Sequence, residues 1–121
     1  MNIAEFLEAR IAEDEADARG AYYDGQRWYS EEEFVGRYPD CCDCGCEVMM
    51  GANRKIEAAH IARWQPSRTL AECAAKRAIV GDHIEAGPVC MPCEREWPCP
   101  TLRHLAAVYS DHPDYQQGWV A

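Results

Sequence analysis

The sequence predicts a mainly α-helical single domain, residues 1–121, with one small β-hairpin and a structural zinc ion. Its 121 residues are enough for one hydrophobic core. Apolar residues recur at helical spacing at both ends of the chain. Eight cysteines are present, and the N-terminus lacks the basic and apolar segments of a secretory signal. We therefore expect a cytoplasmic protein, in which cysteines bind metal more often than they form disulfides.

Acidic residues dominate the first quarter of the chain. Residues 1–33 carry ten carboxylates against three arginines, a net charge of −7, whereas the whole chain has a net charge of −9. A nucleic-acid-binding face is basic, so we expect no nucleic-acid partner. No apolar run approaches the roughly 20 residues of a membrane span, so we also expect no membrane partner. The acidic segment is expected to be a solvated helix face, which could also meet a protein with a basic surface.

The first predicted element is an acidic helix over residues 2–23. Asn2 can cap its N-terminus, and Glu5 stands at the position that completes a capping box. Ile3, Phe6, Leu7 and Ile11 follow at the spacing of one helix face. The carboxylates at 13–17 lie on the opposite side, so the apolar stripe is expected to dock on the rest of the domain.

Two short elements are expected in the middle of the chain. Ser30 followed by Glu31–Glu33 is typical of a helix cap and first turn, which predicts a short helix over 31–37. A cysteine-rich hairpin is predicted over 41–64, because two short segments flank the turn residues 51–53 (Gly-Ala-Asn).

Two further helices are predicted, over 66–84 and 100–111. Pro66 suits the first position of a helix, where its missing N–H costs nothing. The apolar stripe of the earlier helix consists of Leu70, Cys73, Ala74 and Ala78. The later helix has the clearest helical spacing in the chain, with Leu102, Leu105, Ala106 and Tyr109 on one face. Tyr115 and Trp119 in the tail are expected to fold back onto the domain.

A cysteine knuckle over 90–99 carries the main metal prediction. Cys90 and Cys93 have the C-x2-C spacing that points two thiolates at one ion, and Cys99 follows at the start of the last helix. His83 is the nearest candidate for a fourth ligand. These residues predict a Cys3His zinc site, and Cys73 is expected to pack in the core.

The earlier cysteine cluster, CCDCGC at 41–46, leaves several assignments open. Cys41, Cys44 and Cys46 could bind a second zinc ion together with His60. Cys41 and Cys44 could instead join Cys90 and Cys93 in one four-cysteine ribbon. The adjacent Cys41 and Cys42 could also be redox-active. His60 lies in the apolar stretch AAHIA, so it could equally be a hydrogen-bonded core histidine.

Three stretches of the chain resemble one known family. They are WPCPTLRHLAAVYSDHPDYQQGW at 97–119, HIARWQPSRTLAECAAKRAIVGDH at 60–83, and the opening MNIAEFLEARIAEDEADAR. Together they resemble a family of small actinobacterial and actinobacteriophage proteins, a domain of unknown function. The resemblance implies an α-rich fold and groups His83 with the later cysteines. The family usually has Asp where this chain has Gln65, and the CCDCGC insert is not part of its pattern.

Two other resemblances supply alternative functions. The C-x2-C-x5-C spacing is similar to that of WhiB-like iron–sulfur regulators, with Cys73 as a fourth thiolate. Their glycine- and tryptophan-rich turn and basic tail are missing. The order CxxCG, then a hairpin with Ala59-His60-Ile61, then CMPC is similar to that of HNH zinc nucleases, in which His60 would be the general base. Such enzymes usually have an acidic residue or histidine at the position of Ala59 and a downstream asparagine, which this chain lacks.

No phosphate-binding glycine loop and no Gly-x-Ser-x-Gly nucleophile elbow occur in the sequence. We therefore expect a protein that is not an enzyme. Its expected role is that of a small zinc-stapled module for protein–protein interaction. A WhiB-like redox regulator and a degenerate HNH-type nuclease are the alternatives.

Overall fold

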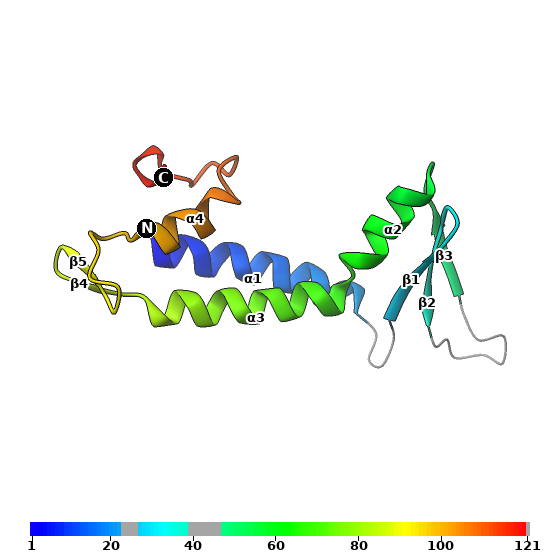
Figure 1. Cartoon of the computed structure of the whole chain (residues 1–121), viewed down its shortest axis with the longest axis horizontal. Helices are drawn as coiled ribbons and strands as arrows, with labels where there is room; N and C mark the ends of the chain where they lie inside the picture. Colours follow the sequence, from blue (N-terminus) through cyan, green and yellow to red (C-terminus); the bar gives the residue numbers. More distant parts are fainter. Residues whose placement is uncertain (23–26, 39–46, 121) are drawn as a thin grey trace. The chain divides into compact units, whose positions relative to one another are not determined.

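The computed structural model describes residues 1–22, 27–38 and 47–120, and Figure 1 shows the order of the elements. The helices are α1 (Ile3–Ala21), α2 (Lys55–Arg63), α3 (Pro66–Asp82), α4 (Pro100–Ala107) and the 3-10 turn η1 (Gln117–Trp119). The strands are β1 (Arg27–Glu31), β2 (Phe34–Tyr38), β3 (Glu47–Gly51), β4 (Ile84–Ala86) and β5 (Val89–Met91). The fold therefore combines helices with two small antiparallel sheets, where the sequence predicted one hairpin.

The described residues group into two compact units. The helical unit comprises Met1–Asp14 and Glu72–Ala121, and the sheet unit comprises Glu15–Ala71. No helix within the described residues combines the length and the apolar character that a membrane span requires.

The predicted capping box starts α1. The Asn2 N–H donates to the Glu5 carboxylate at 2.8 Å, and the Glu5 N–H donates to the Asn2 side chain at 2.9 Å. These two bonds satisfy backbone groups that the first turn of a helix leaves unpaired. The expected apolar stripe of α1 is buried in the core, which consists of Ile3, Phe6, Leu7, Ile11, Cys73, Val80, Cys90, Cys99, Leu102, Ala106 and Trp119.

The C-terminal tail folds back onto α1, as predicted. Trp119 is only 6% exposed, and its ring lies 5.0 Å from that of Phe6 between centroids. Tyr115 contacts both of these rings edge-on, at 6.1 and 5.7 Å. The tail therefore closes the core of the helical unit with aromatic side chains.

The carboxylates of the first half of α1 are engaged within the helical unit. Glu8 pairs with Arg77 of α3 at 3.3 Å, and Asp14 accepts a hydrogen bond from the Tyr109 hydroxyl at 2.6 Å. Glu13 pairs at 2.9 Å with Arg10, whose side chain is 8% exposed. These carboxylates therefore form ion pairs or hydrogen bonds within the fold.

α3 begins at Pro66, as predicted, but its buried face differs from the expected stripe. Cys73 and Val80 are buried, which confirms the core position of Cys73, whereas Ala74 and Ala78 are exposed. The prediction that these alanines form the apolar stripe is wrong. α4 begins at Pro100, as predicted, and ends at Ala107, because turns occupy 108–111 where the sequence predicted further helix.

A β-hairpin occupies the place of the short helix predicted over 31–37. Glu31 pairs with Phe34, so residues 32–33 form the connecting turn, and Glu32 has a positive φ of 51°. The aromatic residues Trp28 and Tyr29 favour strand, and Val35 gains complete burial there. The free energy gained by burying Val35 on this face outweighs the local preference of Ser30 and the following glutamates for a helix start.

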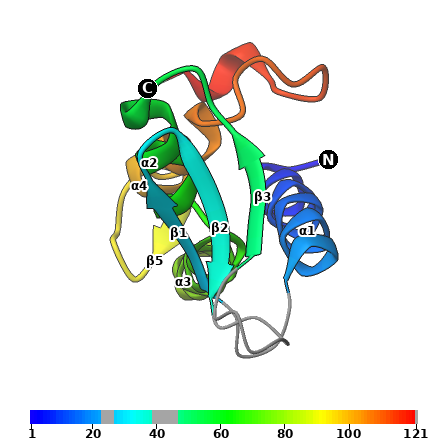
Figure 2. The ribbon, with the colours of Figure 1, turned by 90° about the vertical axis from the view of Figure 1, so that its right-hand side faces the viewer.

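The hairpin predicted over 41–64 is also wrong. β3 instead pairs antiparallel with β2, which completes a sheet of order β1-β2-β3 (Figure 2). The expected second arm is the helix α2, which packs on β1 and β2 with Ala58 and Ala62 buried. Alanine favours helix, and its small side chain allows the helix to approach the sheet closely.

Candidate metal centre

Four predicted ligands converge in the helical unit. One ligand atom from each of His83, Cys90, Cys93 and Cys99 lies within 4.8 Å of all the others. His83 Nδ1 is 3.4 Å from the sulfur of Cys90 and 3.4 Å from that of Cys99. This cluster could hold a metal ion.

A short hairpin returns Cys90 to His83. His83 directly follows α3, and its N–H donates to the carbonyl of Val80 at 3.3 Å. β4 and β5 then pair antiparallel through a two-residue loop whose first residue, Gly87, has a φ of 64°. Glycine at that position is typical of type II′ loops, whose twist matches the flanking strands. The Gly87-Pro88 pair thus marks the turn of a hairpin.

A tight turn after β5 holds Cys90 and Cys93 together. The Cys90 carbonyl accepts a hydrogen bond from Glu94 N–H, and the Cys90 N–H donates to the carbonyl of Arg95, both at 2.8 Å. Glu94 has a positive φ of 55°, which lets the chain reverse within four residues. Cys99 joins from the other side as the N-cap residue of α4. The site is therefore built from a helix end, a knuckle and a helix start.

The cluster is buried on one side and reaches the surface on the other. Cys90 and Cys99 are fully buried members of the hydrophobic core, whereas His83 and Cys93 are half-buried. A metal ion there would be anchored in the core, with two ligands near solvent.

The surroundings shift the pKa values of two of the thiols in opposite directions. A hydrogen bond from the Arg95 backbone N–H lowers the pKa of Cys93 to about 7. Burial raises the pKa of Cys90 to about 12, because the charged thiolate loses its hydration. A bound cation would favour the thiolate at both positions, since it supplies the positive charge that the core lacks.

The donor set and its spacing fit zinc. Three soft sulfur donors and one imidazole are a common ligand set of structural zinc sites. Tetrahedral Zn²⁺ with ordinary Zn–S and Zn–N bonds separates nitrogen and sulfur ligands by about 3.6 Å. The two separations of 3.4 Å between His83 and the cysteine sulfurs are close to that value. These two pairs are therefore already close to the spacing that the ion requires.

The other sequence predictions for metal ligands have different outcomes. Cys41, Cys42, Cys44 and Cys46 lie outside the described residues, so the second zinc site and the four-cysteine ribbon stay predictions. His60 lies on α2 of the sheet unit and is exposed. It is therefore not a core histidine, and it occupies a helix where the nuclease resemblance required a hairpin. The cluster contains His83, and Cys73 is not among its members.

The chain matches, over residues 1–121, the group described as "Family of unknown function (DUF6221)", and it therefore belongs to this family. No curated protein and no solved structure matches the chain.

Proposed function

We propose that this member of the DUF6221 family is a structural zinc protein that acts by binding another protein and does not catalyse a reaction. The observation that carries the zinc assignment is the convergence of His83, Cys90, Cys93 and Cys99 within 4.8 Å. The four residues would fill a tetrahedral coordination sphere, whereas catalytic zinc sites keep a position for water or substrate.

Zinc at this position would stabilise the helical unit. It would join the end of α3, the β4–β5 hairpin and the start of α4, which follow one another along the chain. Binding of structural zinc contributes on the order of 10 kcal/mol to the folding of small domains. The helical unit is therefore expected to lose its fold when the ion is removed.

Elemental analysis of the purified protein tests the zinc assignment. Cys99→Ser should remove one zinc ion per chain, and His83→Ala should weaken its binding. Cys73→Ser is the matched control, because Cys73 is an equally buried cysteine outside the cluster, and this variant should retain the ion. Replacing Cys41, Cys44 and Cys46 by serine would separate any contribution from the second predicted site. A protein without zinc, or one that stays fully folded in strong chelator, would contradict the proposal.

An iron–sulfur cluster is the competing metal assignment for the same cysteines. The presence of His83 among the ligands favours zinc, because most iron–sulfur clusters are held by four cysteine thiolates. Anaerobic purification distinguishes the two, since a brown protein with stoichiometric iron would overturn the zinc assignment.

The absence of catalysis and the cellular setting are also parts of the proposal. The absence of plasmid cleavage with Mg²⁺ or Mn²⁺ would support the exclusion of nuclease activity. The resemblance of residues 97–119 supports an actinobacterial or actinobacteriophage origin. A cytoplasmic location is supported by the metal-type spacing of the cysteines, since thiols stay reduced there.

A further inference from the structure

The outward side of α2, in the sheet unit, carries a second stripe of residues. Ala58 and Ala62 face the sheet and are buried. On the other side, Ile56, Ala59, His60, Arg63 and Trp64 follow the i, i+3, i+4, i+7, i+8 spacing of one helix face. Ile56 is 65% exposed and Trp64 is 46% exposed. α2 therefore presents an apolar and aromatic stripe away from its own core.

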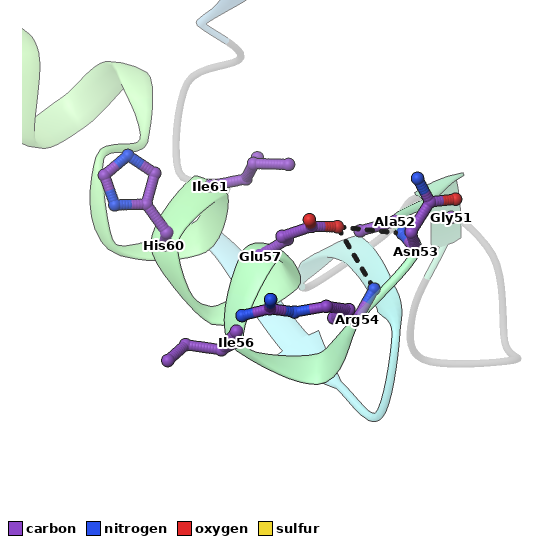
Figure 3. Close-up of a pocket in the computed structure, with 8 residues that line it drawn as sticks. All are labelled: Gly51, Ala52, Asn53, Arg54, Ile56, Glu57, His60 and Ile61. Atoms are coloured by element: carbon purple, nitrogen blue, oxygen red, sulfur yellow. Dashed lines mark hydrogen bonds between the residues drawn. The ribbon is translucent and has the colours of Figure 1, made fainter.

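Two hollows lie along this stripe and share Ile56 and His60. The larger one, of about 610 Å³, lies between α2 and the loop 51–54 that precedes it (Figure 3). The smaller one, of about 410 Å³, extends from His60 to Trp64 and Arg68. We call the two together the α2 groove. The groove therefore follows the outward side of α2 from the loop 51–54 to Arg68.

Positive charge surrounds the α2 groove. Residues 54–68 hold four Arg or Lys residues against one acid, Glu57, a net charge of +3 in a chain of −9. Lys55 pairs with Glu32 at 2.5 Å. Arg54 and Arg63 form no ion pair with any residue that the structure describes. Two guanidinium groups are thus available at the groove for a partner's carboxylates.

Trp64 is held in place by its neighbours. The guanidinium carbon of Arg68 lies 4.1 Å from the Trp64 ring centroid, and the rings of His60 and Trp64 are 6.1 Å apart. A cation over a tryptophan ring stabilises both side chains. A pre-ordered Trp loses less entropy on binding, and Trp and Arg are the residues that most often dominate binding energy at protein interfaces.

We propose that the α2 groove binds an acidic segment of a partner protein, with an apolar side chain of that segment seated against Ile56 and Trp64. The inference rests on the protein-binding part of the proposed function and names the surface and the partner's chemistry. The main argument is charge complementarity. Arg54 and Arg63 lie on either side of the apolar centre at Ile56, so a segment with carboxylates on both sides of an apolar side chain would match the groove.

Two other occupants fit the groove less well. A second copy would have to supply the acidic segment, but Glu8, Glu13 and Asp14 of α1 are already engaged within the helical unit. A nucleic acid carries a phosphate at every nucleotide and would bring one against Glu57, whose carboxylate lines the larger hollow and accepts N–H bonds from Asn53 and Arg54 at 3.1 Å. A protein segment can instead place its apolar side chain at this position and its carboxylates at Arg54 and Arg63. The apolar centre at Ile56 also offers a phosphate no donor.

Fluorescence anisotropy with zinc-loaded, full-length protein tests the inference. The probe is a labelled peptide that repeats Glu-Leu-Glu-Glu, and the same peptide with Lys for Glu and a labelled oligothymidylate are the comparison probes. We expect saturable binding of the Glu peptide only, weakened several-fold by added salt. Trp64→Ala and Arg63→Glu should each weaken binding about tenfold or more. Arg19→Glu, an equal charge change at an exposed position of α1, should leave it unchanged.

Circular dichroism and zinc content of each variant keep the outcomes distinct. Loss of peptide binding with fold and zinc intact supports the groove. Zinc-loaded protein that fails to bind the Glu peptide overturns this inference and leaves the zinc assignment standing. If the protein as purified holds no zinc and still binds the Glu peptide, the zinc assignment fails and this inference stands. Binding of oligothymidylate through Arg63 and Trp64, or self-association abolished by Arg63→Glu, would also overturn it.

Discussion

The side-chain amide of Gln65 pairs with the backbone of Trp28 in the manner of an added strand residue. Its Oε1 accepts from the Trp28 N–H at 3.0 Å, and its Nε2 donates to the Trp28 carbonyl at 3.2 Å. β1 is an edge of the sheet, so these backbone groups have no strand partner on that side. An Asp, which the resemblance places at this position, has no N–H to donate. Gln65 thus pairs with both backbone groups of Trp28, whereas an Asp could accept from the N–H but could not donate to the carbonyl.

Loss of this pairing should destabilise the sheet unit. We expect Gln65→Ala to lower the free energy of unfolding by about 1–2 kcal/mol, because two hydrogen bonds to Trp28 are lost. Hydrogen exchange at the Trp28 amide should become faster, and urea unfolding would give the free energy. Gln117→Ala, at an exposed position in η1, is the control and should change neither quantity. Unaltered exchange at Trp28 in the Gln65 variant would contradict the assigned role.

Gly36 is required by its cross-strand neighbour Tyr29. The two residues are paired in the β1–β2 register, and a methyl group added at Gly36 would collide with the Tyr29 ring. We expect Gly36→Ala to destabilise the sheet unit by about 1–3 kcal/mol, measured by thermal or urea unfolding. Gly20→Ala is the matched control: apart from the chain neighbours and the backbone of the same helix, no heavy atom lies within 4 Å of the added methyl, and alanine favours helix. That variant should be unchanged or slightly more stable.

A double variant separates the collision from a backbone effect at Gly36. If the Tyr29 ring causes the loss, Gly36→Ala should cost much less in a Tyr29→Ala background. Equal costs in both backgrounds would show that the glycine backbone itself is needed.

The hydrogen bond from Tyr109 to Asp14 predicts a dependence of stability on alkaline pH. Burial, with the Asp14 bond in second place, raises the pKa of Tyr109 well above its ordinary value of about 10. The stabilisation is therefore complete below pH about 10, where the tyrosine is protonated in both states. It is lost as the pH rises from there through the folded-state pKa, because only the unfolded chain ionises readily.

Urea unfolding between neutral pH and about pH 11 would measure this effect. Tyr109→Phe should cost about 1–2 kcal/mol at neutral pH and should reduce the alkaline loss of stability. Tyr115→Phe is the control, because Tyr115 packs against the same Phe6 ring but its hydroxyl bonds to no described residue. Identical pH profiles for the two variants would rule out a special role of the Asp14 bond.

Bound zinc should protect the cysteines of the cluster from alkylation. In the folded chain, Cys90 and Cys99 are fully buried and Cys93 is half-buried. We expect iodoacetamide to leave all three unmodified in the zinc-loaded protein, and to modify them once a strong chelator removes the ion and the helical unit loses its fold. Mass spectrometry of the digested protein would report each site. Modification of Cys90 in the zinc-loaded protein would contradict its assignment as a ligand.

Local signals predicted the elements whose partners are close in sequence. The capping box at Asn2 and Glu5 lies within one helical turn, and Pro66 and Pro100 each mark the first turn of a helix. The C-x2-C spacing of Cys90 and Cys93 is likewise a local property. These features depend on a few neighbouring residues, so the surrounding fold does not have to be known.

The predictions that failed concern segments whose conformation depends on distant contacts. Ser30 and the following glutamates have the composition of a helix start, but residues 27–38 form a hairpin that pairs with β3 and packs under α2. The second arm of the predicted hairpin became α2 because Ala58 and Ala62 are buried against that sheet. Neither the sheet face nor the helix could be inferred from its own sequence window.

The sequence alone determined that Cys90, Cys93 and Cys99 are spaced for one metal ion and which helices flank them. The tertiary structure decided that His83 lies among them, because only the β4–β5 hairpin returns the chain from the knuckle to the end of α3. It also decided which acids and bases are left for a partner. Net charge counts residues, whereas the availability of a charge depends on its neighbours in space. Folding engages Glu8, Glu13 and Asp14 of α1 within the helical unit. It leaves the guanidinium groups of Arg54 and Arg63 at the α2 groove.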